Sequence, residues 1–219
     1  MEEMSREEIE QKEAMSRVTT TTHVALGLAL IFTVISIVAI PGPWATKNDD
    51  LQQFTLSGYC FRASTTAEFS CVGYNAFSLP GSNVTFSDAT PEAVSVAFGM
   101  TVAQVAFNVV TLFLLAFFYM SLGAEPSPLG NVLYAKISAG TAALAFIFGL
   151  VAMLAIAGDK SFQTLVWEST LTKDDWFWGA GYLLNIVAWV GALLLDCLVF
   201  VLWAFAAPEE DEEEDDDKE

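Results

Sequence analysis

Residues 58–71 read GYCFRASTTAEFSC, and the two cysteines of this stretch, Cys60 and Cys71, lie in a polar loop between two long apolar runs. The chain has three cysteines, and the third, Cys197, lies deep in the last apolar run. This segregation is typical of one disulfide in an oxidising compartment plus one buried thiol. Two free thiols in the loop are the alternative. The stretch therefore predicts a stapled loop, about 43–93, on the outer side of a membrane.

Four apolar segments make up most of the remaining chain. Hydrophobic residues form 54% of the sequence and the mean hydropathy is +0.48, which is too apolar for an ordinary soluble domain. About 20 apolar residues cross the hydrocarbon core as a helix. We expect membrane spans at about 23–40, 94–122, 132–157 and 176–206, and the last of these opens with the aromatic residues Trp176, Phe177 and Trp178.

The formal net charge of −18 is concentrated at the two ends of the sequence. Residues 1–21 form an acidic arm, and residues 208–219 carry ten of the 27 acids. We expect the tail to be a disordered, solvated segment, with binding of Ca²⁺ or of a basic partner as the alternative. Because the chain has no cluster of Lys and Arg, nucleic acid is excluded as a partner.

The two loops predict how the chain is oriented in the membrane. Four spans put both termini on one side, and the sequence begins Met-Glu-Glu-Met without the positive start of a signal peptide, so the first span is expected to be retained. Asn83 begins a glycosylation sequon, Asn83-Val84-Thr85, in the same loop as the cysteines. We therefore expect a multi-pass glycoprotein of the plasma membrane with cytoplasmic termini and two outer loops, 43–93 and 159–175.

Four amide or carboxyl side chains lie within the spans: Gln104, Asn108, Asn185 and Asp196. Gln104 and Asn108 are one helical turn apart, so they share a helix face. Hydrogen bonds between helices are the first interpretation and a polar pathway is the second. For Asp196, counting from the aromatic residues at the start of the fourth span predicts a position near the opposite interface. Its role is then interfacial or structural, with contact to a partner or an ion as the alternative.

Residues for catalysis are missing from the sequence. His23 is the only histidine and has no nucleophile arranged with it, and there is no phosphate-binding glycine loop or Cys-x-x-Cys pair. We expect no enzymatic activity, no cofactor and no metal site.

The first loop resembles that of the claudin superfamily, which includes claudins, peripheral myelin and epithelial membrane proteins, and gamma-type auxiliary subunits of channels and receptors. Trp44, the stretch Gly58-Tyr59-Cys60, Cys71 and the segment 74–80 are similar to the family's Trp, Gly-Leu-Trp, two cysteines and Leu-Pro segment. Residues 178–182, Trp-Gly-Ala-Gly-Tyr, resemble the family's entry to the fourth span. Tyr59 stands where the family has its second Trp, so the packing beneath the loop is expected to differ.

The resemblance implies a fold and two functions. The fold is an all-α membrane protein, a left-handed four-transmembrane-helix bundle with a small extracellular antiparallel β-sheet, stapled by Cys60–Cys71. The first function is cell-cell adhesion at a cell junction, barrier formation or membrane organisation, in which the loop binds other copies in the same or the facing membrane. The alternative is an auxiliary subunit of an ion channel or receptor. A pathway lined by the first loop, with five acids against two bases and a net charge of −3, would favour cations.

Overall fold

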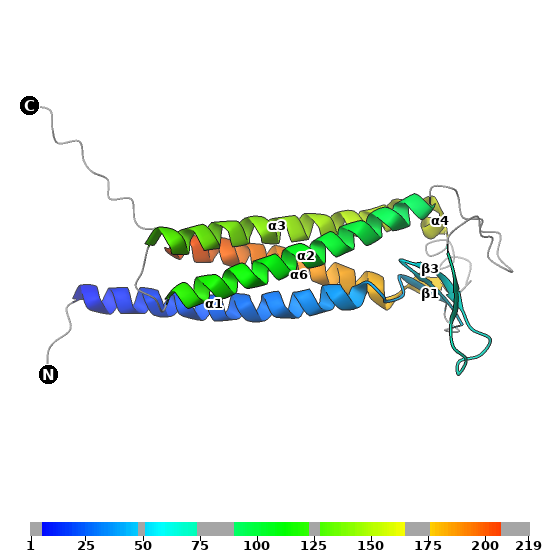
Figure 1. The fold of residues 1–219 in the computed structure, drawn as a ribbon, viewed down its shortest axis with the longest axis horizontal. Coiled ribbons are helices and arrows are strands. Elements are labelled where there is room, and N and C mark those ends of the chain that lie inside the picture. Colours follow the sequence, from blue (N-terminus) through cyan, green and yellow to red (C-terminus); the bar gives the residue numbers. More distant parts are fainter. Residues whose placement is uncertain (1–5, 48–50, 74–89, 123–127, 165–175, 207–219) are drawn as a thin grey trace, which may run out of the picture.

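Four long helices lie side by side, and a small β-sheet stands at one end of them (Figure 1). This architecture is seen in a computed structural model that describes residues 6–47, 51–73, 90–122, 128–164 and 176–206. Arg6, at the start of α1, and Ala206, at the end of α6, both lie at the end opposite the sheet. We call the two ends of the bundle the sheet end and the open end.

The four long helices confirm the expected number of spans. They are α1 (Arg6–Ala39), α2 (Thr90–Leu122), α3 (Pro128–Gly158) and α6 (Ala180–Ala206). Each contains an apolar stretch long enough to cross a membrane, namely Lys12–Ala39, Glu92–Leu122, Val132–Gly158 and Ala180–Ala204. Many large apolar side chains on all four helices are exposed, as expected of helices that face lipid. The chain therefore has the form of a multi-pass membrane protein.

Small residues bring the helices together. α1 packs against α2 and α6, and α3 packs against the same two helices, so the four form a closed ring. On α3 the alanines Ala135, Ala142, Ala145 and Ala152 are fully buried, and such small side chains let neighbouring helices approach closely. Larger side chains such as Phe118 and Leu195 fill the core towards the open end.

The first helix extends beyond the predicted boundary of the first span. The sequence separated an arm at 1–21 from a span at 23–40, whereas α1 continues from Arg6 to Ala39 without a break. Threonines 19–22 lie inside this helix, and the hydroxyl groups of Thr20 and Thr22 donate to the carbonyls of Ser16 and Val18. These bonds to the preceding turn satisfy the hydroxyls within the helix.

Five short strands form one antiparallel sheet at the sheet end, in agreement with the predicted small antiparallel sheet. The strands are β1 (Ala45–Lys47), β2 (Gln52–Thr55), β3 (Gly58–Phe61), β4 (Ser70–Val72) and β5 (Trp176–Trp178). Their order across the sheet is β4-β3-β2-β1-β5. β1 to β4 come from the first loop, and β5 directly precedes α6.

The aromatic stretch at 176–178 is a correction to the sequence analysis. It was predicted as the first turn of the fourth span, but it is a strand that pairs with β1 in the register Ala45↔Trp178 and Lys47↔Trp176. Aromatic residues fit a pleated, half-buried surface well. The pairing with β1 also gives the backbone hydrogen-bond partners before the helix begins at Ala180. The fourth span is consequently shorter than predicted.

Glycines allow the close approach between the first loop and the start of α6. The backbone N–H of Gly179 donates to the carbonyl of Trp44, and that of Gly181 donates to the carbonyl of Pro43. A Cβ on Gly181 would lie 2.6 Å from the carbonyl oxygen of Gly42, and one on Gly179 would overlap the carbonyl of Pro43. Both obstacles are backbone atoms, which cannot turn away as a side chain can.

We expect Gly181→Ala to destabilise the protein by about 1–3 kcal/mol, because the added methyl group forces the two backbones apart. The matched control is Gly99→Ala in α2, where a Cβ would meet nothing within 4 Å. Alanine favours the helix there, so Gly99→Ala should leave stability unchanged or raise it by up to about 1 kcal/mol. Thermal unfolding of both variants in one detergent tests this. Equal midpoints would contradict the backbone contact.

Candidate functional site

Trp44 connects the first loop to the bundle. Its side chain is buried, its indole Nε1 donates to the carbonyl of Ala39 at the end of α1, and its ring packs edge-on against Tyr182 of α6. The backbone N–H of Trp44 donates to the carbonyl of Phe54 at 2.6 Å, and its own carbonyl accepts from Gly179. One residue therefore joins α1, β2 and the start of α6.

The other two motif residues, Gly58 and Tyr59, begin β3 and are also buried. Tyr59 packs against Phe54 with ring centroids 5.1 Å apart, inside a cluster that includes Leu56 and residues from α2, α3 and α6. Tyr59 thus stands where the resemblance predicts a second tryptophan, and its smaller aromatic side chain still packs into the hydrophobic cluster between the sheet and the helices. The cluster anchors the sheet on the bundle.

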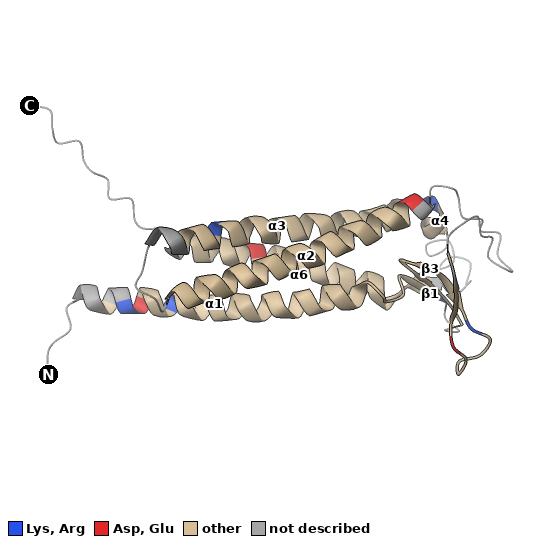
Figure 2. Ribbon diagram, in the orientation of Figure 1, with Lys and Arg blue, Asp and Glu red and all other residues tan. Residues whose placement is uncertain are grey.

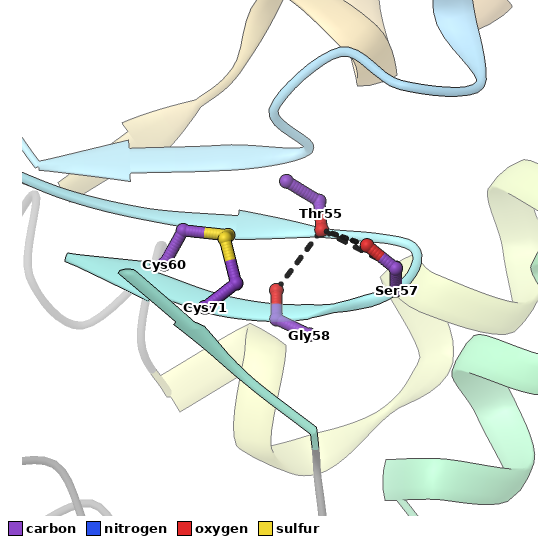
Figure 3. Close-up of a disulfide and its surroundings, with 5 residues drawn as sticks. All are labelled: Thr55, Ser57, Gly58, Cys60 and Cys71. Carbon is purple, nitrogen blue, oxygen red and sulfur yellow. Dashed lines mark hydrogen bonds between the residues drawn. A yellow bond between two sulfur atoms is a disulfide. The ribbon is translucent and has the colours of Figure 1, made fainter. Parts of the chain in front are cut away.

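A tight hairpin joins β2 and β3 (Figure 3). In the register Thr55↔Gly58, only Leu56 and Ser57 lie between the strands. The Thr55 hydroxyl donates to the carbonyl of Gly58 at 3.1 Å, accepts from the backbone N–H of Ser57 and contacts the Ser57 hydroxyl at 2.9 Å. These bonds within the turn fix the register of the two strands.

The predicted disulfide is present and joins the last two strands of the sheet (Figure 3). Cys60 of β3 and Cys71 of β4 are paired residues in the sheet register, with Cα atoms 4.0 Å apart, and they are 11 residues apart in sequence. Cys60 is buried, whereas Cys71 is exposed. The bond therefore holds a short edge strand against the rest of the sheet. The third cysteine, Cys197, is free and exposed on α6, so the prediction that it is a buried thiol is wrong.

The second loop packs against the first loop through Phe162. Asp159 follows α3 and caps α4 (Lys160–Gln163), because its carboxylate accepts from the backbone N–H groups of Ser161 and Phe162. This cap directs Phe162 into the core, where its ring packs edge-on against Phe54 at 5.6 Å. Both loops therefore contribute to one hydrophobic cluster.

β4 forms one edge of the sheet, and no strand in the described part of the chain pairs with its far side. The side chains of Ser70 and Cys71 on this strand are exposed. Next to it, the guanidinium group of Arg62 lies over the ring of the partly exposed Phe69, 4.7 Å from its centroid. A short, accessible edge strand of this kind can accept another strand by backbone pairing.

We expect the double variant Cys60→Ser, Cys71→Ser to release β4 and leave the bundle folded. Closing a loop of this length stabilises a fold by about 3 kcal/mol in the chain-entropy description. β4 should then become sensitive to protease under conditions in which the helices stay protected, and mass spectrometry of the fragments would locate the cuts. Protection of residues 62–72 equal to that in the wild type would contradict this role. The free cysteine offers a control, Cys197→Ser, which should leave the cleavage pattern unchanged.

Two of the four polar residues predicted in the spans hydrogen-bond to a neighbouring helix. Asn108 of α2 donates from Nδ2 to the Ser36 hydroxyl of α1 at 3.0 Å. Asn185 of α6 donates to the carbonyl of Gly149 in α3 at 3.2 Å. Both residues are buried, so these contacts fit the interpretation as bonds between helices.

Gln104 is the exception in this layer. It is fully buried beside Gly149 and Trp189, yet neither its Nε2 nor its Oε1 has a hydrogen-bond partner among the described residues. An unpaired amide in the interior costs about 1–3 kcal/mol. Gln104 is therefore less well satisfied than Asn108, one turn further along the same helix face.

Gln104 and Asn108 form a matched pair for substitution. We expect Gln104→Met to stabilise the protein by about 1 kcal/mol, because it removes an unpaired buried amide at nearly the same volume. Asn108→Leu should instead destabilise it by a similar amount, because the bond to Ser36 is lost. The test is the shift of the thermal midpoint in detergent. Equal shifts in the same direction would show that the two amides are not in different environments.

Asp196 lies two-thirds of the way along the apolar span of α6. Because α6 begins at Ala180 and not at Trp176, Asp196 lies about 24 Å along the helix and about 12 Å before Ala204, where the apolar span ends. Its side chain is half-buried and makes no hydrogen bond or ion pair with any residue that the structure describes. In Figure 2 the charged residues gather towards the ends of the bundle, and an acidic residue inside it stands apart from them. A carboxyl group inside an apolar span is rare and, as a rule, pairs with another group.

Several predicted features lie outside the described residues: the sequon at Asn83, the motif segment 74–80, most of the second loop and the tail 208–219. Within the described ranges, no three His, Cys, Asp or Glu side chains gather as metal ligands would. His23, the only histidine, packs against Tyr119 of α2 near the open end.

The comparisons with known proteins place the chain in no family. No family model matches the sequence, and no curated protein matches it significantly.

Proposed function

We propose that this protein is an integral plasma-membrane protein that mediates cell-cell adhesion, barrier formation or membrane organisation through its stapled sheet. The observation that carries the proposal is the edge strand β4, which lies at the rim of the sheet and is held there by the Cys60–Cys71 disulfide. In this proposal the sheet faces the outside of the cell, both termini are cytoplasmic and the bundle is left-handed. The resemblance to the claudin superfamily points in the same direction.

The geometry of the sheet supports recognition at one edge. β5 and β1 are tied to the start of α6 through Gly179 and Gly181, so that side of the sheet is anchored. β4 is at the opposite side, separated from β5 by three strands. A strand from another copy can therefore approach β4 without displacing any contact that holds the sheet on the bundle.

The disulfide gives this edge a fixed position. A strand of three residues forms few backbone bonds, so without a covalent link it would open readily. Holding the strand in place before binding lowers the entropy cost of adding a partner strand. The disulfide is thus expected to matter for association more than for the fold of the helices.

An auxiliary subunit of a channel or receptor is the second candidate function. It is favoured by a different observation, the half-buried Asp196 without a partner inside the membrane span. Such a group is typical of a site where one membrane protein contacts another. In this case the sheet would serve to position the subunit on its partner.

Mixed cultures distinguish the two functions. Cells that lack their own adhesion proteins and express a fluorescently tagged copy are mixed with non-expressing cells. We expect enrichment at borders between two expressing cells and none at borders with non-expressing cells, since both surfaces must supply a sheet. Uniform signal over the membrane would contradict adhesion and favour the auxiliary subunit.

Two variants locate the contact. Cys60→Ala should abolish the border enrichment, because β4 is released, whereas Cys197→Ala removes a cysteine outside the sheet and should keep it. Ser70→Lys leaves the disulfide intact and adds a positive charge at the exposed edge, which blocks strand pairing. Surface labelling must show equal amounts of each variant at the membrane. Full enrichment with Ser70→Lys would mean that the β4 edge is not the contact.

A further inference from the structure

Asp196 lies on the side of α6 that faces α3. Trp189 and Trp203 lie seven residues before and after it, so the three side chains follow one stripe along the helix. Both tryptophans contact α3: the ring of Trp189 packs against Phe146, and the ring of Trp203 lies under the ammonium group of Lys136. Asp196 therefore lies at the seam between α3 and α6, midway between these two contacts.

The opposite side of this seam is built from small residues. Between Lys136 and Phe146, the positions of α3 on the same stripe are Ala139, Gly140 and Ala143. Gly140 is exposed, and a Cβ at this position would meet nothing within 4 Å. Counting seven residues along each antiparallel helix from the contact of Phe146 with Trp189 sets Asp196 level with Ala139, next to the exposed Gly140. The seam is thus open to the surroundings at this level, and a third helix could approach closely there.

Lys136 of the same chain does not serve as the partner of Asp196. Side chains in a helix lean towards its N-terminus. α3 starts at the open end and α6 starts at the sheet end, so Lys136 leans towards the open end and Asp196 towards the sheet. The Lys136 ammonium group lies 5.2 Å from the centroid of Trp203, about 10 Å further along the bundle than Asp196.

We propose that the seam at Asp196 and Gly140 is a docking site for a membrane-spanning helix of another protein that carries Lys or Arg at the depth of Asp196. Charge complementarity defines the partner, because the acidic group of Asp196 inside the apolar span has no partner among the described residues and a basic group at the same depth supplies one. A small-residue surface beside it lets the backbone of the incoming helix approach.

A second copy of this chain does not fit this site. The basic residues in the described spans are Lys12, Arg17 and Lys136. A copy in the same membrane and orientation places its Lys136 at the level of Trp203, about 10 Å from Asp196 along the membrane normal, and the other two lie nearer still to the open end. The docking site is separate from the β4 edge and does not rest on the adhesion proposal.

The test uses the purified full-length protein in phosphatidylcholine vesicles with a synthetic Leu-Ala transmembrane helix as the probe. One peptide carries a single Lys at the depth of Asp196, a second carries Leu there, and a third carries the Lys two turns away. Energy transfer between a dye on the protein and one on the peptide reports binding. We expect the matched-Lys peptide to bind at least tenfold more tightly than either control peptide.

Variants then assign the binding to the seam. Asp196→Asn keeps the shape of the side chain and should abolish the preference for Lys, and Gly140→Leu fills the open space and should weaken binding with the carboxyl group intact. Glu92→Gln, which removes an exposed acid at the sheet end of α2, should bind as the wild type does. The double variant Cys60→Ser, Cys71→Ser should also bind normally, which separates this site from the sheet.

Three results overturn the proposal. These are equal binding of the Lys and Leu peptides, an unchanged preference for Lys in Asp196→Asn, and Asp196-dependent association of two labelled copies of the protein without any peptide. The last result would assign the seam to contact between copies of this chain.

Discussion

The structure depends on the burial of Trp44 at the junction of the two loops and the bundle. Its indole N–H satisfies a carbonyl at the end of α1, its backbone bonds to Phe54 and Gly179, and its ring packs on Tyr182. A helix end buried without partners for its carbonyls is unfavourable. By supplying that partner, Trp44 lets the chain turn from α1 directly into the sheet. The sheet consequently packs directly against the ends of the helices.

The strand order separates the strands that hold the sheet on the bundle from the edge that we propose to bind a partner. β1 and β5 next to Trp44 join residues more than a hundred positions apart, while β3 and β4 at the other side are local and joined by the disulfide. Contacts that hold the fold and contacts available to a partner therefore lie on different strands. Substitutions in β4 have little effect on the packing of the sheet against the helices, because the hydrophobic cluster beneath the sheet ends at β3.

Local patterns predicted what depends on local sequence. Four apolar runs predicted the four helices, and two segregated cysteines predicted the disulfide, while the small sheet was expected from the resemblance of the first loop. The strand at 176–178 was missed because its partner is β1, far away in the sequence, and because aromatic residues before an apolar run are equally typical of a membrane interface. The alternation Trp-Phe-Trp followed by Gly179 was the available signal.

The polar residues of the spans show which features of the candidate site can be seen only in the three-dimensional structure. Gln104, Asn108, Asn185 and Asp196 look alike in sequence, as single polar interruptions of apolar helices. In the structure Asn108 and Asn185 each bond to a neighbouring helix, while Gln104 and Asp196 do not. These two differ again, because Gln104 is fully buried beside Gly149 and Trp189, whereas Asp196 is only half-buried and can be reached from outside the bundle. An enclosed unpaired amide only lowers stability. An unpaired carboxyl group at an accessible seam can instead be satisfied by another molecule, and this difference in access is the basis of the proposed docking site at Asp196.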